Sequence, residues 1–233
     1  MYKLPHIIFI ILILVMILSM IFLVCGRKVS EYESRITKVM FGIIILIEFI
    51  TNRISVTYYL VTYSTGYSWL YLLPSTWCSL NSLIFGILLF FKKPSKRLLD
   101  WTIFLALLGG VTNLFLPTYL NTQGFFDIRS LTGLMHHVFS LMAAIYLIIT
   151  KRYRPDKFSV IFFLLGMTFT MSIGYFEYYV LKFPSAMQIN ESFFTSNTFL
   201  TILTSWPMCI LGASLVILVC GILCDFKYKK KCV

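Results

Sequence analysis

Long apolar segments alternate with short polar ones along the whole chain. Seven segments rich in Leu, Ile, Phe, Val and Met reach about 20 residues, the length an α-helix needs to cross a bilayer core of ~30 Å. A backbone that crosses lipid must satisfy its own hydrogen bonds, so these segments predict transmembrane helices. The seven predicted spans are about 5–25, 40–62, 72–91, 101–120, 130–150, 158–181 and 199–224. The predicted fold is therefore an all-α, polytopic membrane protein.

Composition and the links between the spans leave no room for a second domain. The chain is 59% hydrophobic and only 12% charged, whereas a soluble domain has about 25% charged residues. The links are short and contain turn and charge residues, as in 92–97 and 151–157. No internal repeat is present in the sequence. We therefore expect residues 1–233 to form a single transmembrane domain.

The net charge of +11 is distributed unevenly. Sixteen of the 20 Lys and Arg residues lie between spans 1 and 2, 3 and 4, or 5 and 6, or in the tail. Because cytoplasmic loops retain Lys and Arg, this pattern predicts an external amino terminus and a cytoplasmic carboxyl terminus. The charge therefore indicates topology and not a nucleic-acid partner, with binding of anionic lipid headgroups to these loops as the alternative. Membrane lipids are the predicted partners and a bacterial-type plasma membrane the predicted location, while the sequence predicts no oligomeric state.

The six cysteines do not follow a metal or disulfide pattern. They lie mostly inside apolar segments, with no C-x-x-C repeat and no Cys/His ligand spacing, at positions 25, 78, 209, 220, 224 and 232. Membrane cysteines usually behave as small hydrophobic residues. We predict no metal site and no cofactor.

Polar and ionisable residues gather in the predicted outer halves of the spans. Such residues are costly inside a membrane and are functional candidates by default. The candidates for binding a substrate in an outward-facing pocket are Glu48, Asn52, Arg53, Asn81, Asn113, His136, Glu177 and Trp206. The alternative is that they join helices through hydrogen bonds that contribute about 0.6–2 kcal/mol each.

Cys78 and His137 are the candidates for chemistry. Cys78 lies ~6 Å below Pro74 in the third predicted span, and the histidine pair lies ~10 Å inside the fifth. A thiol and an imidazole at similar depth could act as a nucleophile and its base. Neighbouring helical side chains point about 100° apart, so only one of His136 and His137 is expected to face this pocket while the other meets a neighbour or lipid.

Four segments carry a family resemblance. They are Leu73-Pro74-Ser75-Thr76-Trp77-Cys78, Gly109-Gly110 through Leu116-Pro117, His137 through Leu147, and Ser205-Trp206-Pro207. In this order, over roughly residues 70–220, they resemble the YwaF-type integral membrane proteins of bacteria. Those proteins are related to a eukaryotic multi-spanning family described as a thiol-dependent phospholipid acyltransferase. The resemblance implies that Cys78 accepts the acyl group and that His137 transfers its proton.

Three functional hypotheses follow, and whether the protein is an enzyme stays open among them. The first is an acyltransferase acting on phospholipid or lysophospholipid from the outer leaflet, with Asn81, Asn113 or Trp206 stabilising the oxyanion. The second is a transporter or receptor that binds a small polar or lipid ligand through the charged residues of the pocket. The third is a structural membrane protein in which the polar groups serve packing.

Overall fold

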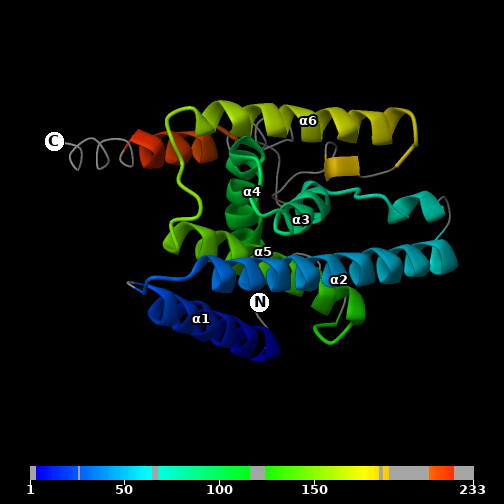
Figure 1. Ribbon diagram of the computed structural model, residues 1–233. Coiled ribbons are helices and arrows are strands. Elements are labelled where there is room, and N and C mark those ends of the chain that lie inside the picture. Colours follow the sequence, from blue (N-terminus) through cyan, green and yellow to red (C-terminus); the bar gives the residue numbers. More distant parts are fainter. Residues whose placement is uncertain are drawn as a thin grey trace.

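The computed structural model describes residues 4–25, 27–64, 68–115, 124–183, 186–188 and 210–222. All regular elements within these ranges are helical (Figure 1). They are α1 (Leu4–Val24), α2 (Glu31–Tyr63), the 3₁₀ helix η1 (Trp69–Leu72), α3 (Trp77–Leu88), α4 (Lys96–Phe115), α5 (Ile128–Ile149), α6 (Ser159–Tyr179), the 3₁₀ helix η3 (Ala186–Gln188) and a last helix, Ile210–Ile222. This confirms the predicted all-helical character.

Five of these helices are long and apolar enough to cross a membrane, namely α1, α2, α4, α5 and α6. Two shorter apolar helices, α3 and Ile210–Ile222, lie at the third and seventh predicted spans. Of the seventh predicted span, 199–224, the structure describes only this last helix. The protein is thus a multi-pass helical membrane protein by the length and composition of its helices.

Helix α5 is the centre of the bundle. In Figure 1, α2 and α6 run across the view with α3 and α4 between them, and α1 lies on the far side of α2. Helix α4 crosses between α6 and α5 and packs against both, while α5 also packs against α2. Of the five long helices, α5 is the most buried and α1 the least. Polar residues on α5 are therefore held inside protein.

Helix α2 begins at Glu31, nine residues before the predicted start of the second span. Ser30 caps it: the Ser30 Oγ accepts from the Glu33 N–H at 3.1 Å, and the Glu33 carboxylate accepts from the Ser30 N–H at 3.0 Å. Reciprocal bonds of this kind stabilise a helix start. The first turns of α2 are polar, which is why apolar length alone placed the boundary too late.

Helix α3 is shorter than the predicted span 72–91. It begins at Trp77, where the Thr76 Oγ1 accepts from the Ser79 N–H at 3.1 Å. Its 12 residues rise about 18 Å, less than the thickness of a bilayer core. Pro74 lies in the non-helical link between η1 and α3. Cys78 is consequently the second residue of its helix.

The basic links meet at one end of the bundle, on the left in Figure 1. In the α5–α6 link, Arg152 pairs with the Glu31 carboxylate at the start of α2. Asp156 in the same link pairs with Lys96 of α4 at 2.9 Å. A Cβ on Gly221 of the last helix would lie 2.5 Å from the Asp156 carbonyl oxygen. Three links and the last helix therefore lie at the same end of the bundle.

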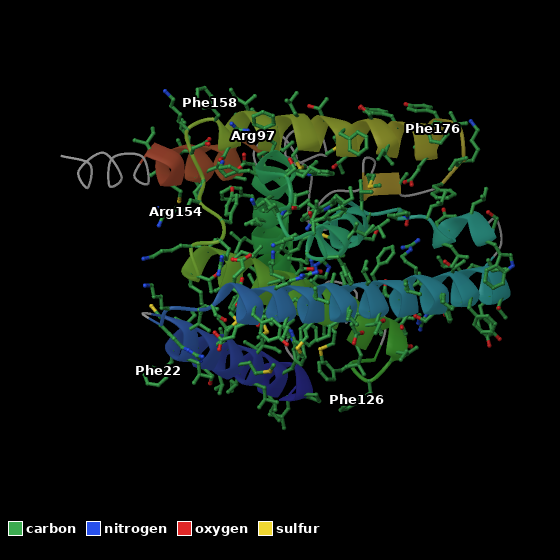
Figure 2. All side chains as sticks on the ribbon, viewed as in Figure 1. Phe22, Arg97, Phe126, Arg154, Phe158 and Phe176 are labelled. Carbon is green, nitrogen blue, oxygen red and sulfur yellow. The ribbon has the colours of Figure 1, made fainter. Side chains whose placement is uncertain are left out.

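Large apolar side chains cover the outside of the bundle. Phe22, Phe126 and Phe176 project away from it in Figure 2, and each is exposed. Exposed Leu, Ile and Val residues also line α1, α2, α6 and the last helix. In water such a surface would drive aggregation, whereas in a bilayer it meets acyl chains of matching polarity.

Candidate functional site

The Cys78 thiol lies against a glycine of α4. A Cβ on Gly109 would be 3.3 Å from the Cys78 Sγ and 3.4 Å from the Trp77 ring. Cys78 itself is half-buried and in the free thiol form. The absence of a side chain at Gly109 thus makes the space that the thiol occupies between α3 and α4.

The next residue of α4 contacts the histidine segment of α5. A Cβ on Gly110 would lie 2.6 Å from the Leu141 Cβ and 3.2 Å from the main-chain oxygen of His137. Two consecutive glycines of α4 therefore face the thiol of α3 and the histidine backbone of α5. The structure in this way brings the Cys78 and His137 segments to one level of the bundle.

His136 and His137 are both buried, with exposures of 5% and 9%. Their ring centroids are 4.2 Å apart, at an interplanar angle of 32°. We expected one ring to meet either a neighbouring side chain or lipid. Because α5 is buried, both rings lie inside protein, beside each other. The His136 ring is therefore a direct neighbour of the His137 ring and can hold it in position.

A hydrogen-bond chain fixes His136 from α2. The Asn52 side-chain amide donates to the Thr132 Oγ1 at 3.2 Å and to the Arg129 carbonyl oxygen at 2.9 Å. The His136 Nδ1 lies 3.0 Å from the Thr132 carbonyl oxygen. Thr132 therefore links the two residues: its hydroxyl contacts Asn52 and its carbonyl oxygen contacts His136. Because a carbonyl oxygen only accepts hydrogen bonds, the Nδ1 of His136 carries the proton.

Arg53 is a buried cation at the same level of α2, only 5% exposed. Its Nη2 donates to the Tyr71 carbonyl oxygen and, at 3.1 Å, to the Ser75 Oγ. Its Nε has no hydrogen-bond partner in the described part of the chain. Arg53 thus connects α2 to the link that leads into α3 and keeps an unused donor.

Glu177 of α6 is the acidic counterpart of Arg53 and is 3% exposed. The two charges interact electrostatically but form no direct ion pair among the described residues. The Glu177 Oε2 has no hydrogen-bond partner within the described ranges. Its main-chain oxygen accepts from the Phe183 N–H at 3.0 Å, and the Phe183 ring stacks on Tyr71 at 4.2 Å.

The other predicted pocket residues are placed less uniformly. Asn81 of α3 is 3% exposed, and its Oδ1 has no partner among the residues described. Asn113 is half-buried and donates to the Gly109 carbonyl oxygen of its own helix at 3.0 Å. Glu48 is half-buried on α2 and makes no hydrogen bond with the described residues. Trp206 lies outside the described residues.

Two participants were not among the sequence candidates. Ser75 accepts from Arg53, and Thr132 joins Asn52 to the histidine segment. Thr132 lies four residues before His136, about one helical turn, and this spacing could have predicted their contact from the sequence. Ser75 has a weaker signal, because a serine between a proline and a helix start is common in any link.

A second polar cluster lies at the opposite end, around the carboxylate of Asp100. This carboxylate is fully buried at the start of α4 and accepts from the Tyr153 hydroxyl at 2.8 Å and the Ser159 hydroxyl at 2.7 Å. Lys96 and Arg97 add ion pairs at 3.1 and 3.3 Å. Both oxygens of the Asp100 carboxylate have partners, so this cluster joins α4, α6 and the α5–α6 link and leaves no free group for a ligand.

Asp127 caps the start of α5. Its carboxylate accepts from the Arg129 side chain at 2.6 and 2.8 Å and from the Arg129 N–H at 2.8 Å. These hydrogen bonds lower the pKa of Asp127 below its ordinary value. The Arg129 guanidinium in turn lies over the Tyr59 ring, 3.6 Å from its centroid. Through Arg129, Asp127 therefore positions the start of α5 against α2.

Comparison with known proteins places this architecture in a family. Neither the curated proteins nor the solved structures contain a match to the chain. A protein-family model, that of the TMEM164 family, matches residues 1–224. The match covers all the described helices and both members of the Cys78 and His137 pair. The chain belongs to the TMEM164 family, a family of multi-pass membrane proteins.

Proposed function

We propose that the protein is a thiol-dependent acyltransferase that moves a fatty acyl group between glycerophospholipids at the outer face of the membrane. The observation that carries this proposal is the glycine pair of α4. Gly109 accommodates the Cys78 thiol, and Gly110 accommodates the backbone of His137. A nucleophile and a base from two different helices thereby approach one level of the bundle, as nucleophilic catalysis requires. The resemblance of this chain to YwaF-type proteins points the same way.

In the first half-reaction, His137 takes the proton of the Cys78 thiol and the thiolate attacks the ester carbonyl of a phospholipid. Collapse of the tetrahedral intermediate breaks the bond from carbonyl carbon to glycerol oxygen. His137 returns its proton to that oxygen, which leaves a lysophospholipid and a Cys78 thioester. Asn81, three residues along α3, would stabilise the developing oxyanion through a hydrogen bond donated by its side-chain Nδ2–H group.

In the second half-reaction, His137 removes the proton from the hydroxyl of an acceptor lysophospholipid. The resulting oxygen attacks the thioester carbonyl, the carbon–sulfur bond breaks, and the proton returns to sulfur. No oxidant or reductant is consumed. The buried position of His137 keeps bulk water away from the thioester and so favours transfer over hydrolysis.

The test follows acyl exchange by the purified full-length protein in vesicles that contain phospholipid and an isotopically labelled lysophospholipid. We expect Cys78→Ala and His137→Ala each to reduce labelled diacyl product at least 100-fold, the usual size of a nucleophile or base effect. Cys220→Ala is the matched control, since Cys220 is also a half-buried free thiol. Unchanged product in both site variants would overturn the proposal.

Ligand binding without chemistry is the second candidate, because Arg53 and Glu177 are buried with unused polar atoms. A receptor or transporter needs these charges but no thiol. It would retain function in Cys78→Ser and lose it in Arg53→Gln. The acyltransferase predicts loss in Cys78→Ser, so one pair of variants separates the two functions.

The topology belongs to the same proposal. Seven spans with an external amino terminus and a cytoplasmic carboxyl terminus would place the Cys78 level toward the outer leaflet of a plasma membrane. The convergence of three basic links and the last helix on one end of the bundle supports this arrangement. Accessibility of single cysteines introduced at Arg154 and Gly124 to an impermeant thiol reagent, in a background with all six native cysteines replaced by alanine, tests it. Labelling of the cysteine at position 154 in intact cells would show that the orientation is the opposite of the proposed one.

A further inference from the structure

Arg53 and Glu177 are buried ionisable residues of opposite charge type. A buried ion normally finds an opposite charge in direct contact, because leaving it unpaired costs several kcal/mol. These two side chains, 5% and 3% exposed, interact electrostatically without direct contact in the described part of the chain. Each retains a buried atom with no hydrogen bond, the Arg53 Nε and the Glu177 Oε2.

The segments that carry the two side chains are packed together. Arg53 is held by the link between η1 and α3 through Tyr71 and Ser75. Glu177 is held at the end of α6, where its carbonyl oxygen accepts from Phe183. The ring of Phe183 stacks on Tyr71, so the segments that carry the two charges are packed together while the charges stay apart.

A third unused atom belongs to α5. His136 is within electrostatic reach of Arg53, and its Nε2 has no partner among the described residues. Its other ring nitrogen is already occupied by the Thr132 carbonyl oxygen. Because Nδ1 carries the proton, Nε2 is an acceptor. Helices α2, α5 and α6 thus each carry a buried side chain with an unused donor or acceptor.

We infer that Arg53 and Glu177 form a headgroup site for a zwitterionic glycerophospholipid, with the guanidinium bound to the phosphate and the carboxylate to the ammonium. Guanidinium is well suited to phosphate oxygens because of its planar set of donors. An anionic headgroup would satisfy Arg53 but leave Glu177 buried without a partner, and a simple cation would do the reverse. A ligand that carries both charges satisfies both residues.

The site also lies where a substrate headgroup would be needed. Ser75, which accepts from Arg53, precedes Cys78 by three residues. A phosphate held by Arg53 would place the glycerol and its acyl ester near the start of α3. This inference rests on the proposed function for its catalytic meaning, but headgroup binding itself can be measured without any acyl transfer.

Native mass spectrometry of the purified full-length protein tests the site. The Cys78→Ala protein, which cannot form a thioester, is mixed with equal amounts of zwitterionic and anionic lysophospholipids of one chain length. We expect about tenfold greater retention of the zwitterionic lipid. Adding Glu177→Gln leaves a net positive site and should reverse the preference toward the anionic lipid. Adding Arg53→Gln should reduce retention of both, with a thermal unfolding curve to show that the protein is folded.

The outcomes distinguish this inference from the proposed function. Equal retention of the two lipids, or a preference unchanged by Glu177→Gln, would overturn the headgroup site even if acyl transfer is observed. Acyl transfer that survives Cys78→Ala would overturn the proposed function while leaving a measured headgroup preference intact. Glu31→Gln serves as the matched control, because Glu31 is a carboxylate of the same helix α2 that pairs with Arg152 at the other end of the bundle.

Discussion

The hydroxyl group of Tyr153 donates to the Oδ1 of Asp100 at 2.8 Å and thereby ties the α5–α6 link to the start of α4. Burial and the neighbouring carboxylate raise the pKa of Tyr153, so the hydroxyl stays protonated and can donate. The Ser159 hydroxyl donates to the same oxygen at 2.7 Å from the first turn of α6. One carboxylate therefore fixes three segments at the end of the bundle opposite to the proposed site.

We expect Asp100→Ala to lower the free energy of unfolding by about 3 kcal/mol, because it leaves two buried hydroxyls without their acceptor and removes one of the two carboxylates that pair with Lys96 and Arg97. Lys96 and Arg97 are partly exposed and can turn to solvent, which places the loss at the lower end for a buried ion pair. Tyr153→Phe removes a single hydrogen bond and should cost about 1 kcal/mol. Thermal or denaturant unfolding in detergent measures both.

Arg154→Gln is the control for these variants. Arg154 lies in the same link, is exposed, and projects away from the bundle in Figure 2. Its replacement should change stability by less than about 0.5 kcal/mol. A loss as large as that of Asp100→Ala would mean that the charge of the link, and not the Asp100 cluster, stabilises this end.

The Asp127–Arg129 contact predicts a pH dependence at the other end. Hydrogen bonds from Arg129 lower the pKa of Asp127 below 3.8, its ordinary value. A carboxylate with a lowered pKa contributes stability that is complete above the unfolded pKa and is lost as the pH falls through the folded pKa. Asp127→Asn should therefore reduce the melting temperature at pH 7 but progressively less below about pH 4. An equal reduction at pH 7 and pH 3 would contradict this prediction.

The fold follows from the sequence as far as apolar length decides it. Helix α5, Ile128–Ile149, lies within two residues of its predicted span 130–150, because its ends coincide with changes in polarity. Helix α2 begins before its predicted span because the Ser30–Glu33 capping box starts the helix in a polar segment. By hydropathy alone, this segment resembles a link between spans. Boundaries set by capping rather than by burial in lipid are missed by a search for apolar segments.

The candidate site was predictable in its residues but not in its connections. Arg53, Glu177 and the histidine pair were identified because ionisable groups are costly in a membrane. The roles of the glycines were not evident, since Gly109 and Gly110 matter only through the side chains that approach them from α3 and α5. Pairing across helices depends on their rotation, which a pattern along one helix does not determine.

Close packing of α4 against α6 gives a prediction about stability. A Cβ on Gly166 of α6 would lie 2.2 Å from the Cγ of Trp101, closer than two carbon atoms can approach. Gly166→Ala should therefore push the helices apart and cost about 1–3 kcal/mol, as overpacking does. Gly212→Ala in the last helix is the control, because nothing lies within 4 Å of a Cβ there and alanine favours helices. Equal melting temperatures for the two variants would show that the α4–α6 contact is loose.

The glycine pair of α4 gives the most direct test of the proposed site. At Gly109 a Cβ would lie 3.3 Å from the Cys78 Sγ, so alanine can be accommodated by a shift of a few tenths of an ångström. Gly109→Ala should therefore leave the melting temperature within about 2 °C of the parent but slow alkylation of Cys78 and acyl transfer at least tenfold, because a small displacement of reacting groups is costly.

Gly110→Ala should behave differently. Its Cβ would lie 2.6 Å from that of Leu141, a contact between backbone-fixed atoms that only a movement of α5 can relieve. We expect a loss of stability together with the loss of activity, whereas Gly109→Ala loses activity alone. If Gly109→Ala keeps full acyl transfer and normal thiol reactivity, the space beside Cys78 has no catalytic purpose, and the glycine serves only to let α3 approach α4.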